Sequence, residues 1–379
     1  MIISNYEGVK RLKTIENEIN QKLEYPITNL GAVEDIVFFD IETTGFSASN
    51  TIVYLIGAVY FENAKWRSIQ WLATKPDDET VLLATFFKFL TRFKTVVHFN
   101  GQGFDIPYLE SKCRTYMLPY SFADYNSIDI YKEIYGMKDI LKVENLKQKT
   151  IESFLGIYRE DKYNGGELIS IYYDYVKTSK KDLEALLLKH NFDDIVGMLD
   201  VLAILAYSDV FKGKFKLKKV SISKNPSEDV LFKKIATFEI ELKTPLKRRI
   251  TYGFGPFYFS MFENSCIIKS LIYTDELKFF YPNYKDYYYL PEEDVSMHKS
   301  VAFYVDKKFR VKAKAANCYS KKTGRFLPQY EEVVTPYFKV NYEDKETYFE
   351  VTEEFLKDEV LVKNYILHLL KYLKNKKKA

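Results

Sequence analysis

Two carboxylates, Asp40 and Glu42, follow directly after the apolar run at residues 36–39. Side chains alternate between the faces of a strand, so both acids point to one side while Ile41 points into the core. Adjacent carboxylates at the end of a buried strand repel each other and are costly to desolvate. A divalent cation with oxygen ligands would cancel that repulsion. Two solvated acids at an exposed strand end are the alternative, so the interpretation depends on further carboxylates elsewhere.

A third acid follows a glycine-containing loop. Residues 100–103 include two glycines, and Pro107 is tolerated only in the first turn of a helix. Asp105 is therefore predicted at a helix N-terminus, just beyond a strand at residues 95–99, where α/β proteins place functional loops. Asp129, at the start of another short element, is a candidate for a supporting role only.

The fourth acid belongs to the longest helical pattern of the sequence, residues 181–207. His190 and Asp194 are four residues apart and share one face of this helix with apolar side chains. Asp193 points elsewhere. A hydrogen-bonded core histidine beside a surface acid is the structural alternative to a site.

Together these segments predict a metal centre with four carboxylates: Asp40, Glu42, Asp105 and Asp194. Four converging acids suit two Mg²⁺ or Mn²⁺ ions about 3.5–4 Å apart. Such ions activate a water for attack on phosphorus and stabilise the leaving oxygen. His190 is our candidate for the general base, because histidine is the side chain that ordinarily exchanges protons near neutral pH.

The motifs resemble a known family. Residues 39–45 (FDIETTG), 100–109 (NGQGFDIPYL) and 190–195 (HNFDDI) are similar to the three motifs of DEDD-type, DnaQ-like 3′–5′ exonucleases. The closer resemblance is to the YprB ribonuclease H-like domain family, whose intermediate segment also resembles residues 145–147 (NLK) and 155–157 (LGI). The resemblance covers roughly residues 33–208, with the motifs in the family's order.

This resemblance implies a ribonuclease H-like α/β fold, a mixed sheet flanked by helices, with two metals bound by the four acids. It also implies substrate contacts from Thr43, Asn100, Phe104 and Asn191. Asn100 either orients the strand end or touches a nucleotide, and Phe104 either packs beneath the metals or stacks on a base. His190 departs from the family, because it stands four residues before the last Asp, at the spacing where relatives carry tyrosine. Whether it is the base or only binds water or phosphate stays open.

With 379 residues, 47% of them hydrophobic and 28% charged, the sequence predicts a globular protein of two domains. We expect strands near residues 35–42, 51–60 and 66–73 and a helix over 79–93. A helix over 8–22 and short C-terminal strands, including 301–304 and 310–315, are also expected, before a final helix over 353–373. The expected divisions are an N-terminal helical extension (1–32), the ribonuclease H-like exonuclease domain (33–212), a basic linker (213–226) and a smaller β-rich accessory domain with a basic tail (227–379).

Charge is unevenly distributed along the chain. Residues 221–379 contain 28 Lys and Arg against 22 Asp and Glu, a net of +6, whereas residues 1–220 carry a net of −2. The basic balance, including residues 247–249, permits contact with a polyanion. Oligomerisation or docking of a protein partner is equally permitted for this half.

The three cysteines stand far apart, which argues against a zinc ribbon or disulfide framework and fits a reducing compartment. The N-terminus lacks the apolar stretch of a signal peptide, and no run suits a membrane span. We therefore expect a cytoplasmic protein that does not associate with a membrane. From the family resemblance we expect its partner to be nucleic acid, either single-stranded or at 3′ ends.

The functional hypothesis is a two-metal 3′–5′ exonuclease that hydrolyses single-stranded DNA or RNA. The alternative is a catalytically weak or inactive nuclease-fold protein that binds nucleic acid or recruits partners. The sequence does not decide between DNA and RNA, because recognition of the 2′-hydroxyl depends on loop geometry.

Overall fold

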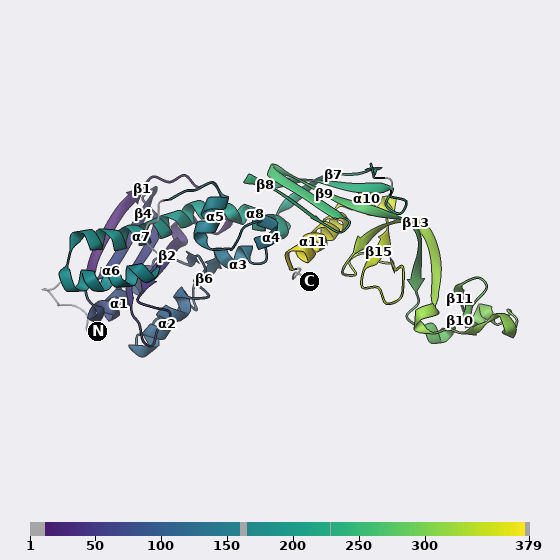
Figure 1. Ribbon diagram of the computed structural model, residues 1–379, viewed down its shortest axis with the longest axis horizontal. Helices are drawn as coiled ribbons and strands as arrows, with labels where there is room; N and C mark the ends of the chain where they lie inside the picture. The colour runs from purple at the N-terminus through teal and green to yellow at the C-terminus, as the bar shows by residue number, and fades with distance from the viewer. Residues whose placement is uncertain (1–11, 160–164, 228, 376–379) are drawn as a thin grey trace. The chain divides into compact units, whose positions relative to one another are not determined.

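The computed structural model describes residues 12–159, 165–227 and 229–375, and the chain divides into two compact units, Met1–Ser208 and Asp209–Ala379. Figure 1 shows the course of the chain. No helix in the described ranges combines the length and the apolar character needed to cross a membrane.

The first unit is built on a mixed six-stranded sheet with the order β1-β4-β3-β2-β5-β6. Strands β2, β5 and β6 are parallel, and the other pairs are antiparallel. The strands are β1 (Leu12–Ile19), β2 (Ile36–Thr43), β3 (Val53–Glu62), β4 (Lys65–Ala73), β5 (Thr95–His98) and β6 (Asn126–Asp129).

Helices cover both faces of this sheet (Figure 1). Helices α1 (Glu79–Leu90) and α2 (Asp105–Thr115) pack on one face, where Phe39 and Trp71 belong to the core. Helices α6 (Gly165–Thr178) and α7 (Lys181–Val201) cover the other, around Tyr54 and Leu72. The remaining helices are α3 (Ile130–Ile134), α4 (Lys138–Leu141), α5 (Gln148–Phe154) and α8 (Leu205–Phe211).

The expected N-terminal helix is wrong for the described residues, because Leu12–Ile19 forms strand β1, while residues 1–11 lie outside the described ranges. Every residue of β1 pairs with β4, from Leu12 opposite Ala73 to Ile19 opposite Trp66. Strand β1 lies at the edge of the sheet and is rich in charged residues, as edge strands often are. It therefore lacks the apolar alternation that marks a strand, and its local sequence was interpreted as a polar helix. The pairing partner lies about 50 residues away, and no local pattern reveals it.

The second unit contains a fully antiparallel six-stranded sheet, β14-β15-β13-β9-β8-β7. Its strands are β7 (Phe215–Lys224), β8 (Lys234–Phe254), β9 (Phe257–Phe280), β13 (Tyr319–Gln329), β14 (Tyr337–Phe338) and β15 (Thr347–Glu350). A smaller sheet joins β10 (Tyr287–Leu290), β11 (Val295–His298) and β12 (Val311–Lys312). The helices are α9 (Lys299–Ala302), α10 (Glu353–Lys357) and α11 (Glu359–Asn375).

The predicted β-rich character of this half is confirmed, but several local expectations differ. Strands β8 and β9 have 21 and 24 residues and are not short, and only Val311–Lys312 of the expected strand at residues 310–315 is a strand. The segment taken as a basic linker forms edge strand β7, since lysines are common on exposed sheet edges. Residues 301–304 belong to α9 and the turn that follows, not to a strand. The expected final helix is interrupted at Asp358 and forms α10 and α11. Lys376, Lys377 and Lys378 of the basic tail lie outside the described residues.

Candidate functional site

Strand β2 presents Asp40 and Glu42 on the face of the sheet that α7 covers. Their neighbours Phe39 and Ile41 point to the opposite face and are buried against α1 and α2. Burial, followed by the charges of Asp105, Asp194 and Glu42, raises the pKa of the Asp40 carboxyl well above its ordinary value. The neighbouring acids therefore oppose ionisation of Asp40.

Asn191 of α7 positions Asp40 through a side-chain hydrogen bond. Its side-chain amide donates to Asp40 Oδ2 (3.3 Å), and its oxygen accepts from Gln70 Nε2 (3.0 Å). Gly57 lies opposite Asp40 on β3, and a Cβ there would come within 2.1 Å of Asn191 Oδ1. Asn191 is 0% exposed. This burial contradicts the expected substrate contact, because the amide is occupied inside the protein, and Asn191 instead positions Asp40.

Asp105 opens α2 and is buried. Burial raises the pKa of its carboxyl to about 7, although its own backbone N–H and that of Ile41 partly oppose the rise. The loop before it is fixed by Asp129, whose carboxylate accepts the backbone N–H groups of Asn100 (2.9 Å) and Gln102 (3.1 Å). Asp129 thus supports the loop that presents Asp105.

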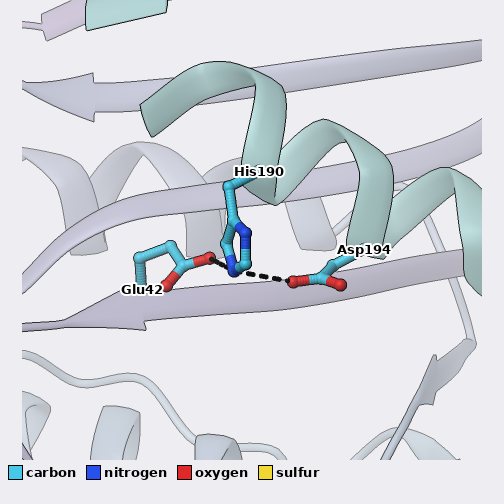
Figure 2. A group of neighbouring side chains, drawn as sticks. All are labelled: Glu42, His190 and Asp194. Atoms are coloured by element: carbon cyan, nitrogen blue, oxygen red, sulfur yellow. Dashed lines mark ion pairs between the residues drawn. The ribbon is translucent and has the colours of Figure 1, made fainter. Parts of the chain in front are cut away.

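His190 lies between two acids (Figure 2). Its Nε2 atom is 3.3 Å from Asp194 Oδ2, one turn further along α7, and 3.7 Å from Glu42 Oε1 of β2. One ligand atom from each of the three residues lies within 4.8 Å of the others, so together they are able to hold a metal ion. Carboxylate oxygens with an imidazole suit Mn²⁺, and the oxygens alone suit Mg²⁺.

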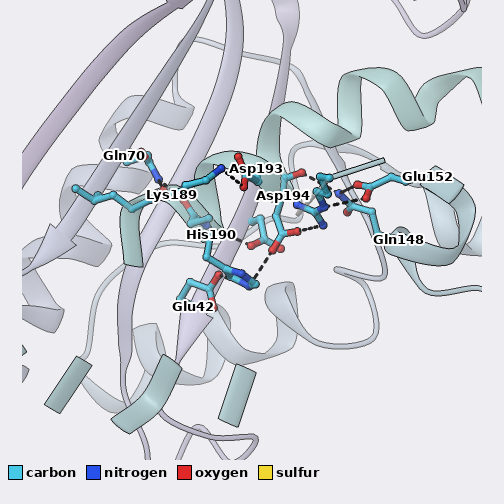
Figure 3. A network of polar contacts seen from close by, with 12 residues as sticks. Glu42, Gln70, Gln148, Glu152, Lys189, His190, Asp193 and Asp194 are labelled. Carbon is cyan, nitrogen blue, oxygen red and sulfur yellow. Dashed lines mark hydrogen bonds and ion pairs between the residues drawn. The ribbon is translucent and has the colours of Figure 1, made fainter. Parts of the chain in front are cut away.

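Sequence reasoning missed Arg159, which forms an ion pair with Asp194 Oδ1. Its Nε forms an ion pair with Glu152 Oε2, 2.9 Å away, and Glu152 is itself 2% exposed. Gln148 donates to Glu152 Oε1 (3.0 Å) and to the backbone oxygen of Asp194 (2.9 Å), as Figure 3 shows. Gly197 gives α5 room to approach α7, since a Cβ there would lie 2.6 Å from Glu152 Oε1.

Contacts from Gln148 and Arg159, which lie outside the three motifs, therefore anchor the turn of α7 that carries Asp194. Figure 3 shows the surrounding polar network. The only sequence signal for it was the resemblance of residues 155–157 to the family's intermediate segment, which ends two residues before Arg159. On the same helix, Asp193 pairs with Lys189 (2.7 Å), away from the carboxylates, as expected.

The remaining predicted contacts lie at the end of β2 and in the loop between β5 and α2. Thr43 donates its hydroxyl to the backbone oxygen of Gly45 (2.9 Å), which fixes the turn after β2. Asn100 is exposed and has a positive φ of 64°. Phe104 is half-buried, and its ring meets that of Phe46 edge-on, with centroids 6.1 Å apart. Phe46 is 94% exposed, and sequence reasoning had missed it.

Comparison with known proteins agrees with this architecture. The sequence profile of the RNase H superfamily matches residues 37–206. This part of the chain is an RNase H-like domain. The match spans β2 to α8 and includes all four carboxylates and His190.

Solved structures show more remote likeness. A family B DNA polymerase from the archaeon Pyrobaculum calidifontis has a TM-score of 0.35 and 14% identity, covering 68% of this chain and 36% of the polymerase. A structure of exonuclease I has a TM-score of 0.28 and 10% identity, covering 55% of each chain. The E. coli exonuclease I–ssDNA complex in its zinc-bound form has a TM-score of 0.27 and 10% identity, covering 54% of each. This chain thus spans between about a third and a half of these proteins, and no curated protein matches its sequence.

Proposed function

We propose that this protein is a divalent-metal-dependent 3′–5′ exonuclease of the YprB type that hydrolyses phosphodiester bonds in single-stranded DNA or RNA. The observation that carries the proposal is the convergence of acids from three separated segments of an RNase H-like domain. The charges of Glu42 on β2, Asp105 on α2 and Asp194 on α7 each raise the pKa of Asp40 on β2. Grouped acids of this kind are characteristic of functional sites.

The donor chemistry of the site fits two Mg²⁺ or Mn²⁺ ions. Bound by these carboxylates, two ions would supply an activated water and stabilise the oxygen that leaves phosphorus. In this proposal His190 accepts the proton of that water, and the position of its Nε2 beside Glu42 and Asp194 supports the role. Arg159 supplies a positive charge at Asp194, and a second ion pair with Glu152 fixes the position of Arg159.

The loops beside the acids support a single-stranded substrate. The exposed ring of Phe46 and the neighbouring ring of Phe104 offer faces on which an unpaired base stacks. A base in a duplex is already stacked on its neighbours, so this contact favours a frayed or single-stranded end. The 3′–5′ direction follows from the resemblance of the three motifs.

One observation favours the alternative of nucleic-acid binding with weak turnover. Asp194 already contacts Arg159 and His190, so one predicted metal ligand is neutralised by the protein itself. A metal would have to compete with these partners for the carboxylate. The free, buried cysteines fit the predicted cytoplasmic location under either proposal.

The deciding experiment is digestion of 5′-labelled single-stranded DNA and RNA with Mn²⁺ or Mg²⁺. We expect a ladder of shortened products from the wild type and a loss of at least 100-fold in rate for Asp194→Asn, since a ligand is removed. Asp193→Asn is the matched control, because Asp193 lies on the same helix but forms an ion pair with Lys189 at the surface. Binding without digestion by the wild type would establish the alternative, and equal digestion by both variants would exclude the proposed site.

A further inference from the structure

A groove of about 420 Å³ lies in the second unit, at the end of β9 and beside β14. Six aromatic residues line it: Phe279, Phe280, Tyr281, Tyr284, Tyr337 and Tyr342. We call this feature the aromatic groove. Five of the six residues are partly exposed, and the sixth, Tyr342, is 39% exposed. A concentration of accessible rings in a concavity is a feature of binding sites rather than of a packed core.

The rings of the groove are held by one another. Phe280 meets Tyr342 edge-on with centroids 5.3 Å apart, and Phe279 meets Tyr281 in the same manner at 5.3 Å. Tyr281 also stacks on Tyr287 of β10 at 4.5 Å. The aromatic walls are thus positioned before any ligand arrives, which reduces the entropy lost on binding.

Two lysines lie side by side at the groove. Lys278 and Lys339 occupy opposite positions of an isolated antiparallel bridge, and their backbone groups exchange two hydrogen bonds of 2.9 Å. Directly opposite residues project to one face of a sheet, where like charges are destabilising. Within the described part of the chain neither lysine pairs with a carboxylate. Lys278 Nζ lies 4.6 Å from the centre of the Tyr319 ring, and Lys339 Nζ donates to the Tyr342 backbone oxygen.

The chain around the groove has the same chemical character. Residues 299–314 contain six Lys and Arg against a single Asp. Within this segment Phe303 is 73% exposed and Tyr304 is 86% exposed. Ala315, the residue that follows this segment, lines the groove. Accessible rings that alternate with cations match a ligand with flat, stackable groups along an anionic backbone.

We propose that the aromatic groove is a second nucleic-acid site that binds a single strand, with bases stacked on its rings and phosphates on Lys278 and Lys339. Binding here is independent of hydrolysis, although its use in holding a strand for digestion rests on the proposed function. Aromatic grooves also bind proline-rich peptides. The adjacent lysines favour the nucleic acid, because a polyproline segment carries no charge that would offset their repulsion.

The test is fluorescence anisotropy of the full chain with a labelled oligothymidylate in EDTA, across a salt series. All proteins carry Asp194→Asn, so that residual cleavage does not disturb the measurement. We expect the double variant Lys278→Ala/Lys339→Ala to reduce the slope of log affinity against log salt by about 1.4, the value for two lost phosphate contacts. Tyr342→Ala is expected to weaken binding about tenfold or more, whereas Tyr342→Phe retains it.

Lys322→Ala is the matched control, because Lys322 is a neighbouring surface lysine that pairs with Glu350. Unchanged affinity and salt slope in the double variant would overturn the proposal, as would an equal effect of Lys322→Ala. Binding of a labelled polyproline peptide that Tyr342→Ala abolishes, without an effect on the oligonucleotide, would assign the groove to peptides instead. Digestion by the wild-type chain is measured separately, so failure of the groove is distinguished from failure of the nuclease proposal.

Discussion

At the scale of single residues, the site depends on charge compensation. Burial raises the pKa of the Asp40 carboxyl, and the charges of Asp105, Asp194 and Glu42 add to that rise. Arg159 offsets part of this negative charge through its ion pair with Asp194, and His190 lies between Glu42 and Asp194. Arg159 is in turn fixed by Glu152, which lies almost fully buried behind it.

This arrangement predicts a coupled effect of Arg159 and Glu152 on stability. Arg159→Ala leaves the Glu152 carboxyl buried without its guanidinium partner, and we expect the free energy of unfolding to fall by about 3 kcal/mol. Adding Glu152→Gln removes the charge that lost its partner and is expected to restore most of that loss. Urea unfolding of the two single variants and the double variant measures the coupling.

Lys189→Ala serves as the comparison, because its ion pair with Asp193 is exposed and is expected to contribute under about 1 kcal/mol. If Arg159→Ala were no more destabilising than Lys189→Ala, the buried ion pair would have no structural importance.

At the scale of elements, the loop between β5 and α2 presents Asp105, and His98 at the end of β5 supports it. Its Nδ1 accepts the backbone N–H of Gly101 (3.0 Å), and its Nε2 lies 2.8 Å from Ser127 Oγ on β6. A Cβ at Gly101 would come within 2.6 Å of the imidazole, so the glycine allows the loop to close over the ring. The neutral imidazole is therefore part of the loop's structure.

The buried His98 predicts a loss of stability in mild acid. Burial lowers the pKa of His98 from 6.5 to about 4, because it outweighs the opposing effect of Asp129, 3.6 Å away, while Lys132 adds to the lowering. The unfolded chain thus binds this proton at higher pH than the folded chain. The stabilisation is present above about pH 6.5 and is lost as the pH falls towards 4, by up to about 3 kcal/mol.

Urea unfolding at pH 7.5 and pH 5 measures this effect. In His98→Gln, where no imidazole titrates, the difference between the two pH values is expected to shrink. An unchanged pH dependence in that variant would assign the acid sensitivity to other groups.

At the scale of the whole molecule, the two units have separate chemical characters. All the carboxylates of the proposed metal centre belong to the RNase H-like unit, whereas the aromatic groove belongs to the β-rich unit. Both tryptophans, Trp66 and Trp71, lie on β4 of the first unit. Tryptophan fluorescence therefore reports on the unit that holds the proposed centre.

This separation predicts a local effect of metal. Mg²⁺ that binds the folded carboxylates and not the unfolded chain stabilises the first unit by about 2.7 kcal/mol at 100 times its Kd. We expect the tryptophan-monitored melting temperature to rise with Mg²⁺ in the wild type and in Asp193→Asn. No rise is expected for Asp194→Asn, and a rise of equal size there would place metal binding elsewhere.

The sequence alone determined the positions of the acids and the class of the fold. Asp40 and Glu42 alternate along an apolar strand, Asp105 stands beside a proline-marked helix start, and His190 and Asp194 share a helix face. Each of these signals is local, since it depends on the strand or helix period or on one proline. These local predictions agree with the structure because the packing of the core requires the same strand and helix periods that the sequence shows.

Tertiary structure alone decided the rest. Strands β1 and β7 are edge strands that form because they pair with β4 and β8. Taken by itself, the charged sequence of β1 resembles a helix and that of β7 resembles a linker. Asn191 became a buried support of Asp40 because Gly57 leaves room for it, and Arg159 reaches Asp194 because Glu152 and Gly197 bring α5 close to α7. These contacts join residues that are distant in the chain, so their energies appear only when the elements are packed together.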